Sequence, residues 1–162
     1  IKTQYQNMHA KSPSFHNSNF QNFFYVPENV YIIGTMNDID RSVESFDFAL
    51  RRRFTWKEVK PEDTADEILK NLQNDRLIQQ AKEHMFRLNQ AISEQAGLSP
   101  AYHIGAAYFL KLTDYHNNDS PFDNLWNNHL EPLLREYLRG IDDSIENKLA
   151  SLKEAYLSAG NI

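Results

Sequence analysis

The sequence predicts an α/β part over residues 1–60 and an all-α part over residues 61–162. Residues 30–33 are β-branched or aromatic without a polar interruption, which is typical of a strand buried on both faces of a parallel sheet. Residues 54–59 alternate between large apolar and polar side chains, which predicts a strand covered on one face. After Pro61 the apolar residues recur at three- and four-residue spacing, so we expect helices from that point.

The composition is that of a globular protein, and it narrows the possible partners. Of 162 residues 41% are hydrophobic, and 17 basic against 22 acidic residues give a formal charge of −5. Because phosphate binding needs clustered cations, we expect any DNA contact to lie in other regions. The absence of cysteine excludes disulfides and thiolate metal sites and suits a reducing cytoplasm. No apolar run approaches membrane-spanning length, so we expect a cytoplasmic protein without a membrane partner.

We expect residues 1–24 to form a connecting segment. Turn-forming residues interrupt this stretch, and its apolar residues follow neither a helical nor a strand period. The phenylalanines of this segment are expected to anchor it to the sheet. A stacking platform for nucleic acid is the alternative, but basic residues are not interleaved with them. His9 and His16 have no carboxylates nearby at ligand spacing, so we expect no metal site.

Polar side chains follow directly after the strand predicted at 30–33. Asn37, Asp38 and Asp40 stand at its carboxyl end, the edge where open parallel sheets bind their ligands. Ser42 can cap a following helix. The apolar residues of that helix recur at helical spacing, namely Val43, Phe46, Ala49 and Leu50. We therefore expect the chemistry of the protein at the turn over residues 37–40.

Three consecutive arginines, Arg51, Arg52 and Arg53, end this helix. Cations at a helix C-terminus are favoured by the helix dipole, so one interpretation is a charged cap on a surface helix. The other is that one or two of them reach a phosphate, because guanidinium binds phosphate oxygens in pairs and stabilises the charge that develops in phosphoryl transfer. The adjacent turn at 37–40 favours the second interpretation.

The stretches YVPENVYIIGTMNDIDRS and FALRRRF together resemble the McrB family, the GTPase subunits of McrBC-type modified-cytosine restriction systems. Only Asp38 and Ile39 depart from the family motif, at its two variable positions. Further along, IGAAYFLKL and HLEPLLREYL resemble the helical lid of that family more loosely. The resemblance therefore runs through most of residues 24–157.

The resemblance implies the C-terminal part of an AAA+ core over residues 1–60 and a helical lid over residues 61–162. It implies that Asn37 is the sensor-1 residue at the tip of the fourth core strand. It links the Asn-x-x-Asp run, which ends at Asp40, to a preference for GTP, and it makes Asp38 and Arg41 expected nucleotide contacts. The arginine run takes the position of the finger that reaches a neighbouring subunit's nucleotide, so Asn37, Arg51, Arg52 and Arg53 are the expected catalytic residues. A homo-oligomeric ring and a nuclease subunit of the McrC type are the implied partners.

The phosphate loop and the paired magnesium-binding acids of an AAA+ protein are missing from this sequence. None of its five glycines belongs to a Gly-x-x-x-x-Gly-Lys-Ser/Thr run, and no apolar strand ends in two acids. Both motifs precede the sensor-1 strand in AAA+ proteins and the first residue is Ile, so we expect the chain to be part of a longer protein. GTP or ATP with Mg²⁺ is the expected cofactor of the full-length protein. This piece alone is expected neither to bind nucleotide tightly nor to hydrolyse it.

The all-α part predicts a lid of four or five helices. The break at residues 60–63 places a proline and acids where a helix starts. Gly97 can terminate a helix whose apolar stripe comprises Leu77, Ile78, Ala81, Met85, Leu88 and Ile92. A short apolar helix is expected at 106–112. The next helix begins at Pro121, ends at Gly140 and carries inward Leu125, Trp126, Leu130, Leu133, Leu134, Tyr137 and Leu138. A last helix carries Ile141, Ile145, Leu149, Leu152 and Tyr156.

His103 precedes the short helix expected at 106–112, where the resemblance implies the sensor-2 residue of an AAA+ lid. That residue is an arginine that touches the γ-phosphate, and no arginine is available here. His103 could donate to a phosphate when protonated, although a histidine near neutral pH is a poor substitute for a permanent cation. His103 is therefore a candidate nucleotide contact.

Three functions stay open from the sequence. The first is the sensor-1-to-lid portion of a GTP-hydrolysing ring subunit that drives DNA translocation for a restriction nuclease. The second is an ATP-driven AAA+ remodelling protein of the MoxR type, in which the sensor-1 and arginine regions can be similar. The third is a non-catalytic interaction module that kept the helical bundle and lost the phosphate loop.

Overall fold

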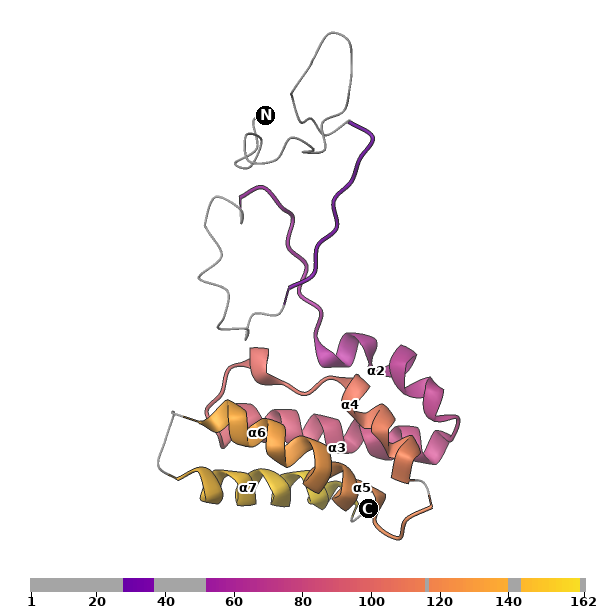
Figure 1. The fold of residues 1–162 in the computed structure, drawn as a ribbon, viewed down its shortest axis with the longest axis vertical. Coiled ribbons are helices and arrows are strands. Elements are labelled where there is room, and N and C mark those ends of the chain that lie inside the picture. Colours follow the sequence, from indigo (N-terminus) through magenta and orange to yellow (C-terminus); the bar gives the residue numbers. More distant parts are fainter. Residues whose placement is uncertain (1–27, 37–51, 116, 140–143, 161–162) are drawn as a thin grey trace, which may run out of the picture. The chain divides into compact units, whose positions relative to one another are not determined.

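The computed structural model describes residues 28–36, 52–115, 117–139 and 144–160 (Figure 1). The chain divides into two units, Ile1–Asn37 and Asp38–Ile162. In the first unit the described residues form a turn at 28–29 and then a segment without regular secondary structure. In the second, residues 52–60 lack regular structure and the described helices begin at Pro61. The predicted domain boundary between residues 60 and 61 stays a prediction.

The structure has no strand at 30–33 or at 54–59, where the sequence predicts them. The side chains of these segments lie open to solvent instead: Tyr31 is 89% exposed, Ile33 93% and Val59 64%. The physical reason is that a strand is held by hydrogen bonds to a neighbouring strand and by cover on its faces, and apolar residues alone supply neither. The α/β part of the predicted fold is therefore not formed in the described residues, whereas the all-α part is.

The first described helix begins where the sequence predicts a break. Helix α2, Pro61–Leu69, has proline in its first turn, where the missing N–H costs no hydrogen bond. The Asp63 carboxylate accepts the backbone N–H of Lys60 at 3.0 Å and so ties the chain before the helix to its first turn. A short 3₁₀ turn, η1 (Lys70–Leu72), follows and ends at Gln73, whose φ of 53° is left-handed. The chain thereby reverses into the next helix.

Helix α3, Asp75–Glu94, confirms the longest predicted stripe. The side chain of Asn74 caps its start by accepting the N–H of Leu77 at 3.0 Å. Ala81, Met85, Leu88 and Ile92 are buried, and Leu77 and Ile78 pack partly buried against the core. Gly97, with φ +69°, turns the chain just beyond the helix, as predicted.

The chain after Gly97 runs through two short helical pieces. A 3₁₀ turn, η2 (Pro100–Tyr102), leads to helix α4, Ala106–Phe109, which continues as the 3₁₀ segment η3, Leu110–Tyr115. The short apolar helix predicted at 106–112 is thus present, with its C-terminal half tightened into 3₁₀ geometry. Ala106, Phe109 and Leu112 are fully buried, which anchors this piece in the core.

One helical run extends from Pro121 to Leu138 and contains a π-helical turn that the apolar spacing does not predict. It consists of α5 (Pro121–Leu125), η4 (Trp126–Leu130) and α6 (Glu131–Leu138). Within it, the N–H of Glu131 bonds to the carbonyl of Trp126, five residues back. Pro132 explains the wider turn, because proline has no N–H and its ring clashes with the carbonyl four residues earlier. Gly140, the predicted end, lies outside the described residues.

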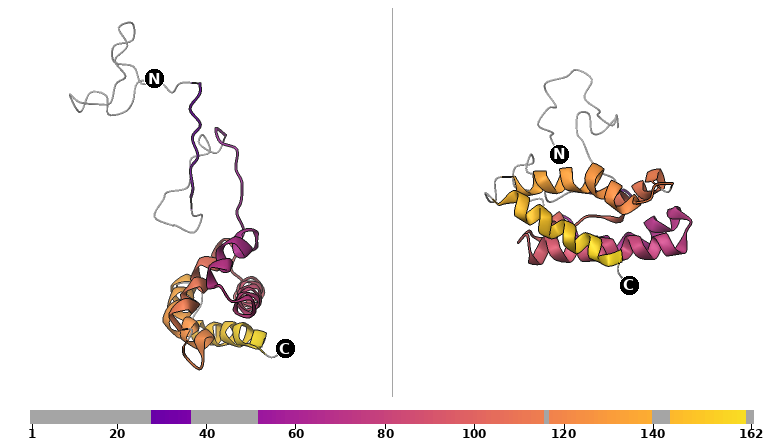
Figure 2. Two further views of the ribbon diagram at one scale, coloured as in Figure 1. Left: turned by 90° about the vertical axis from the view of Figure 1, so that its right-hand side faces the viewer. Right: turned by 90° about the horizontal axis from the view of Figure 1, so that it is seen from below.

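Helix α7, Ile145–Leu157, closes the bundle and is followed by the 3₁₀ turn η5, Ser158–Gly160. It lies along α3 and contacts α6 (Figure 2). Ile145, Leu149, Leu152 and Tyr156 face the core, whereas Ile141 lies outside the described residues. The largest fully buried side chains come from all the described α-helices, from η3 and η4, and from the segment before α4, namely Trp126, Tyr156, Phe109, Leu69, Leu88, Ile92, Ile104, Leu112, Leu125, Leu130, Leu134 and Leu138. The predicted lid therefore has one shared core.

The left-handed turn at Gly97 gives a first test of this fold. A Cβ at this position meets nothing within 4 Å, so a substitution is opposed by the backbone conformation alone. Gly97→Ala should lower the free energy of unfolding by about 1 kcal/mol, whereas Gly97→Asn should lower it less, because asparagine tolerates the left-handed region. Urea unfolding of the two variants, followed by circular dichroism, measures the difference. Equal losses for Ala and Asn would contradict this account of the turn.

Candidate functional site: the segment at residues 103–105 and the arginine turn

Most of the residues predicted to bind or hydrolyse nucleotide lie outside the described residues. They are Asn37, Asp38, Asp40, Arg41 and Arg51. Arg52 and Arg53 are described and occupy an exposed turn. Exposed guanidinium groups are accessible to a phosphate. The roles of all seven residues stay predictions.

Of the predicted site residues that the structure describes, His103 is the one with a hydrogen-bonded side chain. Its Nε2 lies 2.8 Å from the Ser93 hydroxyl, which comes from the last turn of α3. Partial burial lowers the pKa of His103 below its ordinary value, and the nearby Glu62 carboxylate opposes that change only in part. The imidazole is therefore neutral at neutral pH. The neutral ring can donate one hydrogen bond and accept another, but it does not supply the permanent positive charge of a sensor-2 arginine.

Asn89 fixes the backbone next to His103. Its amide oxygen accepts the N–H of Ile104 at 2.7 Å, and its amide nitrogen donates to the carbonyl of Ile104 at 3.0 Å. Asn89 is only 7% exposed and Ile104 1%, so water does not compete for these groups. With the Ser93 hydroxyl one turn further along α3, two side chains of that helix hold residues 103–104 in place. Gly105 then leads directly into α4.

The burial of Asn89 could have been predicted from its position in the sequence, although it is not one of the apolar residues of the predicted stripe. Asn89 lies four residues after Met85, so helical spacing places it on the same face as the predicted apolar stripe. A polar residue in that register is buried and must find a partner. The partner itself, the backbone of Ile104, could not be identified from spacing, because it lies beyond the end of the helix.

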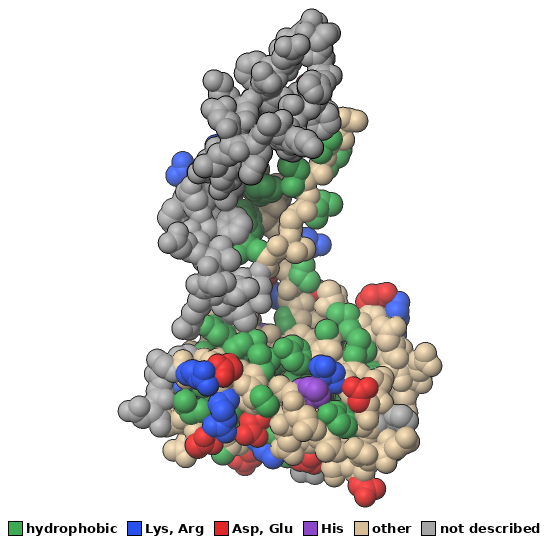
Figure 3. All heavy atoms as spheres, in the orientation of Figure 1, with side chains coloured by type: hydrophobic (Ala, Val, Ile, Leu, Met, Phe, Trp, Pro, Cys, Tyr) green, Lys and Arg blue, Asp and Glu red, His purple; other side chains and the backbone are tan. Residues whose placement is uncertain are grey.

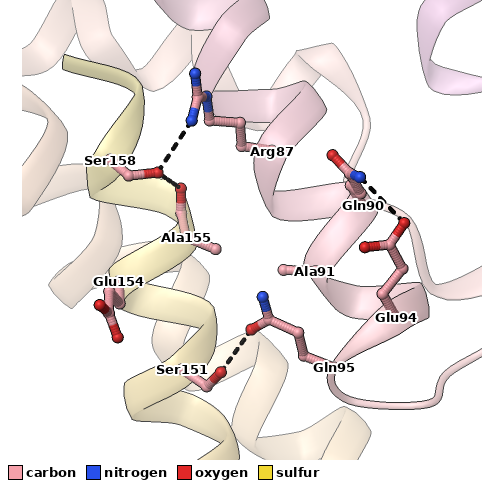
Figure 4. Close-up of a pocket in the computed structure, with 9 residues that line it drawn as sticks. All are labelled: Arg87, Gln90, Ala91, Glu94, Gln95, Ser151, Glu154, Ala155 and Ser158. Carbon is pink, nitrogen blue, oxygen red and sulfur yellow. Dashed lines mark hydrogen bonds between the residues drawn. The ribbon is translucent and has the colours of Figure 1, made fainter. Parts of the chain in front are cut away.

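An open groove of about 450 Å³ separates parts of α3 and α7 (Figure 4). Most of its polar groups bond to each other across and along the helices: the Ser151 hydroxyl donates to the side-chain amide oxygen of Gln95, and Arg87 donates to the Ser158 hydroxyl at 3.4 Å. Gln90 donates to Glu94 at 3.0 Å on one wall. These groups satisfy one another, so the groove is a polar surface feature of the helix pair.

The helices carry no obvious phosphate-binding surface on the face drawn in Figure 3. There, acidic and basic side chains of the helical part lie among one another, and the basic ones do not gather into one field. Among the described residues no group of three or more histidine or acidic side chains is placed to hold a metal ion. Within the same residues, no helix has the length and apolarity needed to cross a membrane.

The described helices pack around one core, which is the part of the chain that the comparisons with known proteins identify. Residues 80–146 match the family model described as the McrB alpha-helical lid domain. The chain is also 37% identical over 135 residues to the type IV methyl-directed restriction enzyme EcoKMcrB subunit of Escherichia coli strain K12. That match covers 77% of this chain and 29% of the relative, so the chain spans less than a third of the relative's length. No solved structure matches significantly.

The chain contains the helical lid of an McrB-family protein. The predicted resemblance is thereby confirmed for this region. The lid match at 80–146 includes Asn89, Ser93 and His103, so the contacts that hold residues 103–104 belong to the lid itself.

The two hydrogen bonds between the Asn89 amide and the backbone of Ile104, here called the Asn89 clamp, give the second prediction. Asn89→Leu leaves a buried N–H and a buried carbonyl without their partner, so the free energy of unfolding should fall by about 1–3 kcal/mol. The matched control is Asn71→Leu, because Asn71 also donates to a backbone carbonyl, that of Ile68 at 2.8 Å, but in an exposed position. That change should cost less than about 0.5 kcal/mol. Urea unfolding followed by Trp126 fluorescence in a Trp56→Phe background measures both free energies of unfolding. Equal losses for the two variants would show that the buried bonds of Asn89 stabilise the fold no more than the exposed bond of Asn71.

Proposed function

We propose that this chain is the sensor-1-to-lid part of a GTP-preferring AAA+ motor subunit in a modified-cytosine-specific DNA restriction system. The observation that carries the proposal is the extent of the similarity to the restriction enzyme subunit. A stretch covering 77% of 162 residues is about 125 residues long and includes the arginine run wherever it begins, whereas the lid match starts only at residue 80. The likeness therefore extends from the lid into the part that holds the expected chemistry.

The exposed apolar residues of the first unit support an incomplete core. Val30, Tyr31, Ile32 and Ile33 are 48%, 89%, 63% and 93% exposed. Four neighbouring large apolar side chains this open to water indicate a surface that another part of the protein covers. We infer that they form the sensor-1 strand once the other strands of an AAA+ sheet lie beside them. Such pairing supplies the backbone partners that the segment lacks here.

The residues at the end of that strand would act on the nucleotide. Bound GTP supplies the γ-phosphoryl group that water attacks. Asn37 would orient the attacking water through its amide, and Asp40 would accept hydrogen bonds from the guanine edge. Arg52 and Arg53 suit the anionic triphosphate because they are exposed and permanently charged. The described residues hold no cluster of acids for Mg²⁺, so its ligands would come from elsewhere in the protein.

The lid would present residues 103–105 to the nucleotide as a fixed segment. Because His103 is neutral and hydrogen-bonded to Ser93, its expected part is a hydrogen bond rather than a charge contact. The arginine run would provide the cation in trans, from the neighbouring subunit of a ring. A nuclease of the McrC type is the partner that the family implies.

The role of Asn37 can be tested in the intact subunit. Asn37→Ala should lower GTP turnover by roughly 100-fold while the Kd for GTP changes little, because the amide acts on the transition state. Steady-state hydrolysis and equilibrium nucleotide binding, each with GTP and with ATP, measure this and the nucleotide preference together. Asn118→Ala, in an exposed loop, is the control and should leave both quantities unchanged. Unchanged turnover in Asn37→Ala would refute the sensor-1 role.

The arginine finger can be tested by mixing subunits. Subunits with both Arg52→Ala and Arg53→Ala should bind GTP but not hydrolyse it, and subunits lacking the phosphate-loop lysine should also be inactive alone. Mixed rings should regain part of the activity, because some interfaces then combine one intact half from each variant. Size-exclusion chromatography checks that the rings assemble. If no mixing ratio exceeds the sum of the separate activities in assembled rings, the arginines are a helix cap or act within their own subunit.

A further inference from the structure

His84 lies buried where three helices of the lid meet. It belongs to α3 and is 3% exposed. Its ring stacks on Phe122 of α5, with centroids 3.9 Å apart and planes 12° apart, and it lies 4.8 Å from the ring of Tyr156 of α7. The Tyr156 hydroxyl donates to the carbonyl of Phe122 at 3.1 Å, which joins α7 to α5 beside the imidazole. The imidazole therefore contacts both helices that close the core over α3.

One nitrogen of this ring has no hydrogen-bond partner. Nδ1 of His84 is buried, and none of the described residues offers it a donor or an acceptor. The absence of an acceptor favours the neutral tautomer that has its proton on Nε2, in which Nδ1 carries only a lone pair. A proton added there creates a charged N–H without an acceptor, and a buried ionised donor in that state is strongly unfavourable.

The charged groups around His84 do not remove this penalty. Burial lowers the pKa of His84; the backbone of Tyr156 and the carboxylates of Glu83 on α3 and Asp123 on α5 raise it, and Arg87 on α3 lowers it. The net direction is down. On the α7 side, burial raises the pKa of the Tyr156 phenol, so this group stays neutral and offers the imidazolium no charge.

We propose that His84 is an acid-sensitive joint of the lid, at which a proton taken up on Nδ1 loosens the packing of α5 and α7 on α3. The imidazole of His84 on α3 contacts both Phe122 of α5 and Tyr156 of α7. A single protonation of this ring therefore affects the packing of both helices on α3. Neither hydrolysis of GTP nor the AAA+ assignment is needed for it. Acidification would shift the lid from its closed core toward a state in which the ring reaches water.

The direction of the pH dependence follows from linkage. An unfolded chain binds the His84 proton with the ordinary pKa of about 6.5, whereas the folded lid binds it only at lower pH. The stability that depends on the neutral ring is therefore complete above about pH 6.5. It is lost as the pH falls from there toward the pKa of the folded state.

Trp126 provides the readout, because its ring lies 5.3 Å from that of Tyr156. In the 162-residue chain carrying Trp56→Phe, Trp126 is the remaining tryptophan. Its emission is recorded from pH 8 to pH 5, and the His84 Cε1–H resonance is titrated by NMR in the same samples. We expect a red shift of the emission whose midpoint lies below about 6.5 and coincides with the titration of His84.

Matched variants separate His84 from the two other histidines of the described lid residues. His84→Gln should abolish the red shift, whereas His103→Gln and His129→Gln should keep it, because those side chains are only partly buried and bond to Ser93 and Tyr115 instead. A shift that persists in His84→Gln overturns the proposal. If that variant does not fold, the NMR titration decides alone. A His84 pKa of 6.5 or more, or a titration without any response of Trp126, refutes the joint.

Discussion

The pair of hydrogen bonds between the Asn89 amide and the backbone of Ile104 sets the geometry of the lid. Beyond the turn at Gly97 the chain runs back against α3 through η2, and it carries the backbone of Ile104 into the apolar core before α4 begins. One amide satisfies both groups of Ile104 at once, with good length in each bond. Ala106 and Phe109, which follow directly, are fully buried. The register of α4 against α2 and α3 thus depends on where Asn89 holds the preceding residue.

Helix α3 also packs against α7, the last helix of the bundle. The packing of α7 on α3 is closed at one end by His84, Phe122 and Tyr156, and at the other by two polar bonds. Lys148 donates to the carbonyl of Ala96 at 3.3 Å, just past the end of α3, and Ser151 donates to Gln95. A cation at that position also suits the negative end of the helix dipole. The same helix therefore orients the segment at 103–104 and the last helix of the bundle, which makes it the reference for the whole lid.

The helices were predictable from the sequence because their information is local. The start of α2 was predicted from Pro61, the start of α5 from Pro121, and the end of α3 from Gly97 and the apolar spacing before it. The lid sequence resembled the family only loosely, and the comparison confirms that resemblance over residues 80–146. The π-helical turn was missed because Pro132 interrupts a stripe without changing its apolar period. His84 and Asn89 occupy buried register positions, so their burial could be inferred, but Phe122 and Ile104 as their contacts could not. Those contacts join segments 38 and 15 residues apart, and spacing along one helix contains no record of them.

The strands predicted at 30–33 and 54–59 are not formed, because a strand depends on interactions that are not local. This difference between helices and strands bears on function. A helix satisfies its backbone within itself, so the lid closes its core with Leu88, Ile92 and Trp126 from its own sequence. A buried parallel strand depends on neighbours on both sides, and residues 30–33 have none among the described residues. Under the proposed function, the lid is then a self-contained body, while the segment carrying Asn37 acquires its form only within an assembled core. The geometry of catalysis would be set by that assembly, and the lid would bring to it a segment at 103–105 whose shape is already fixed by Asn89 and Ser93.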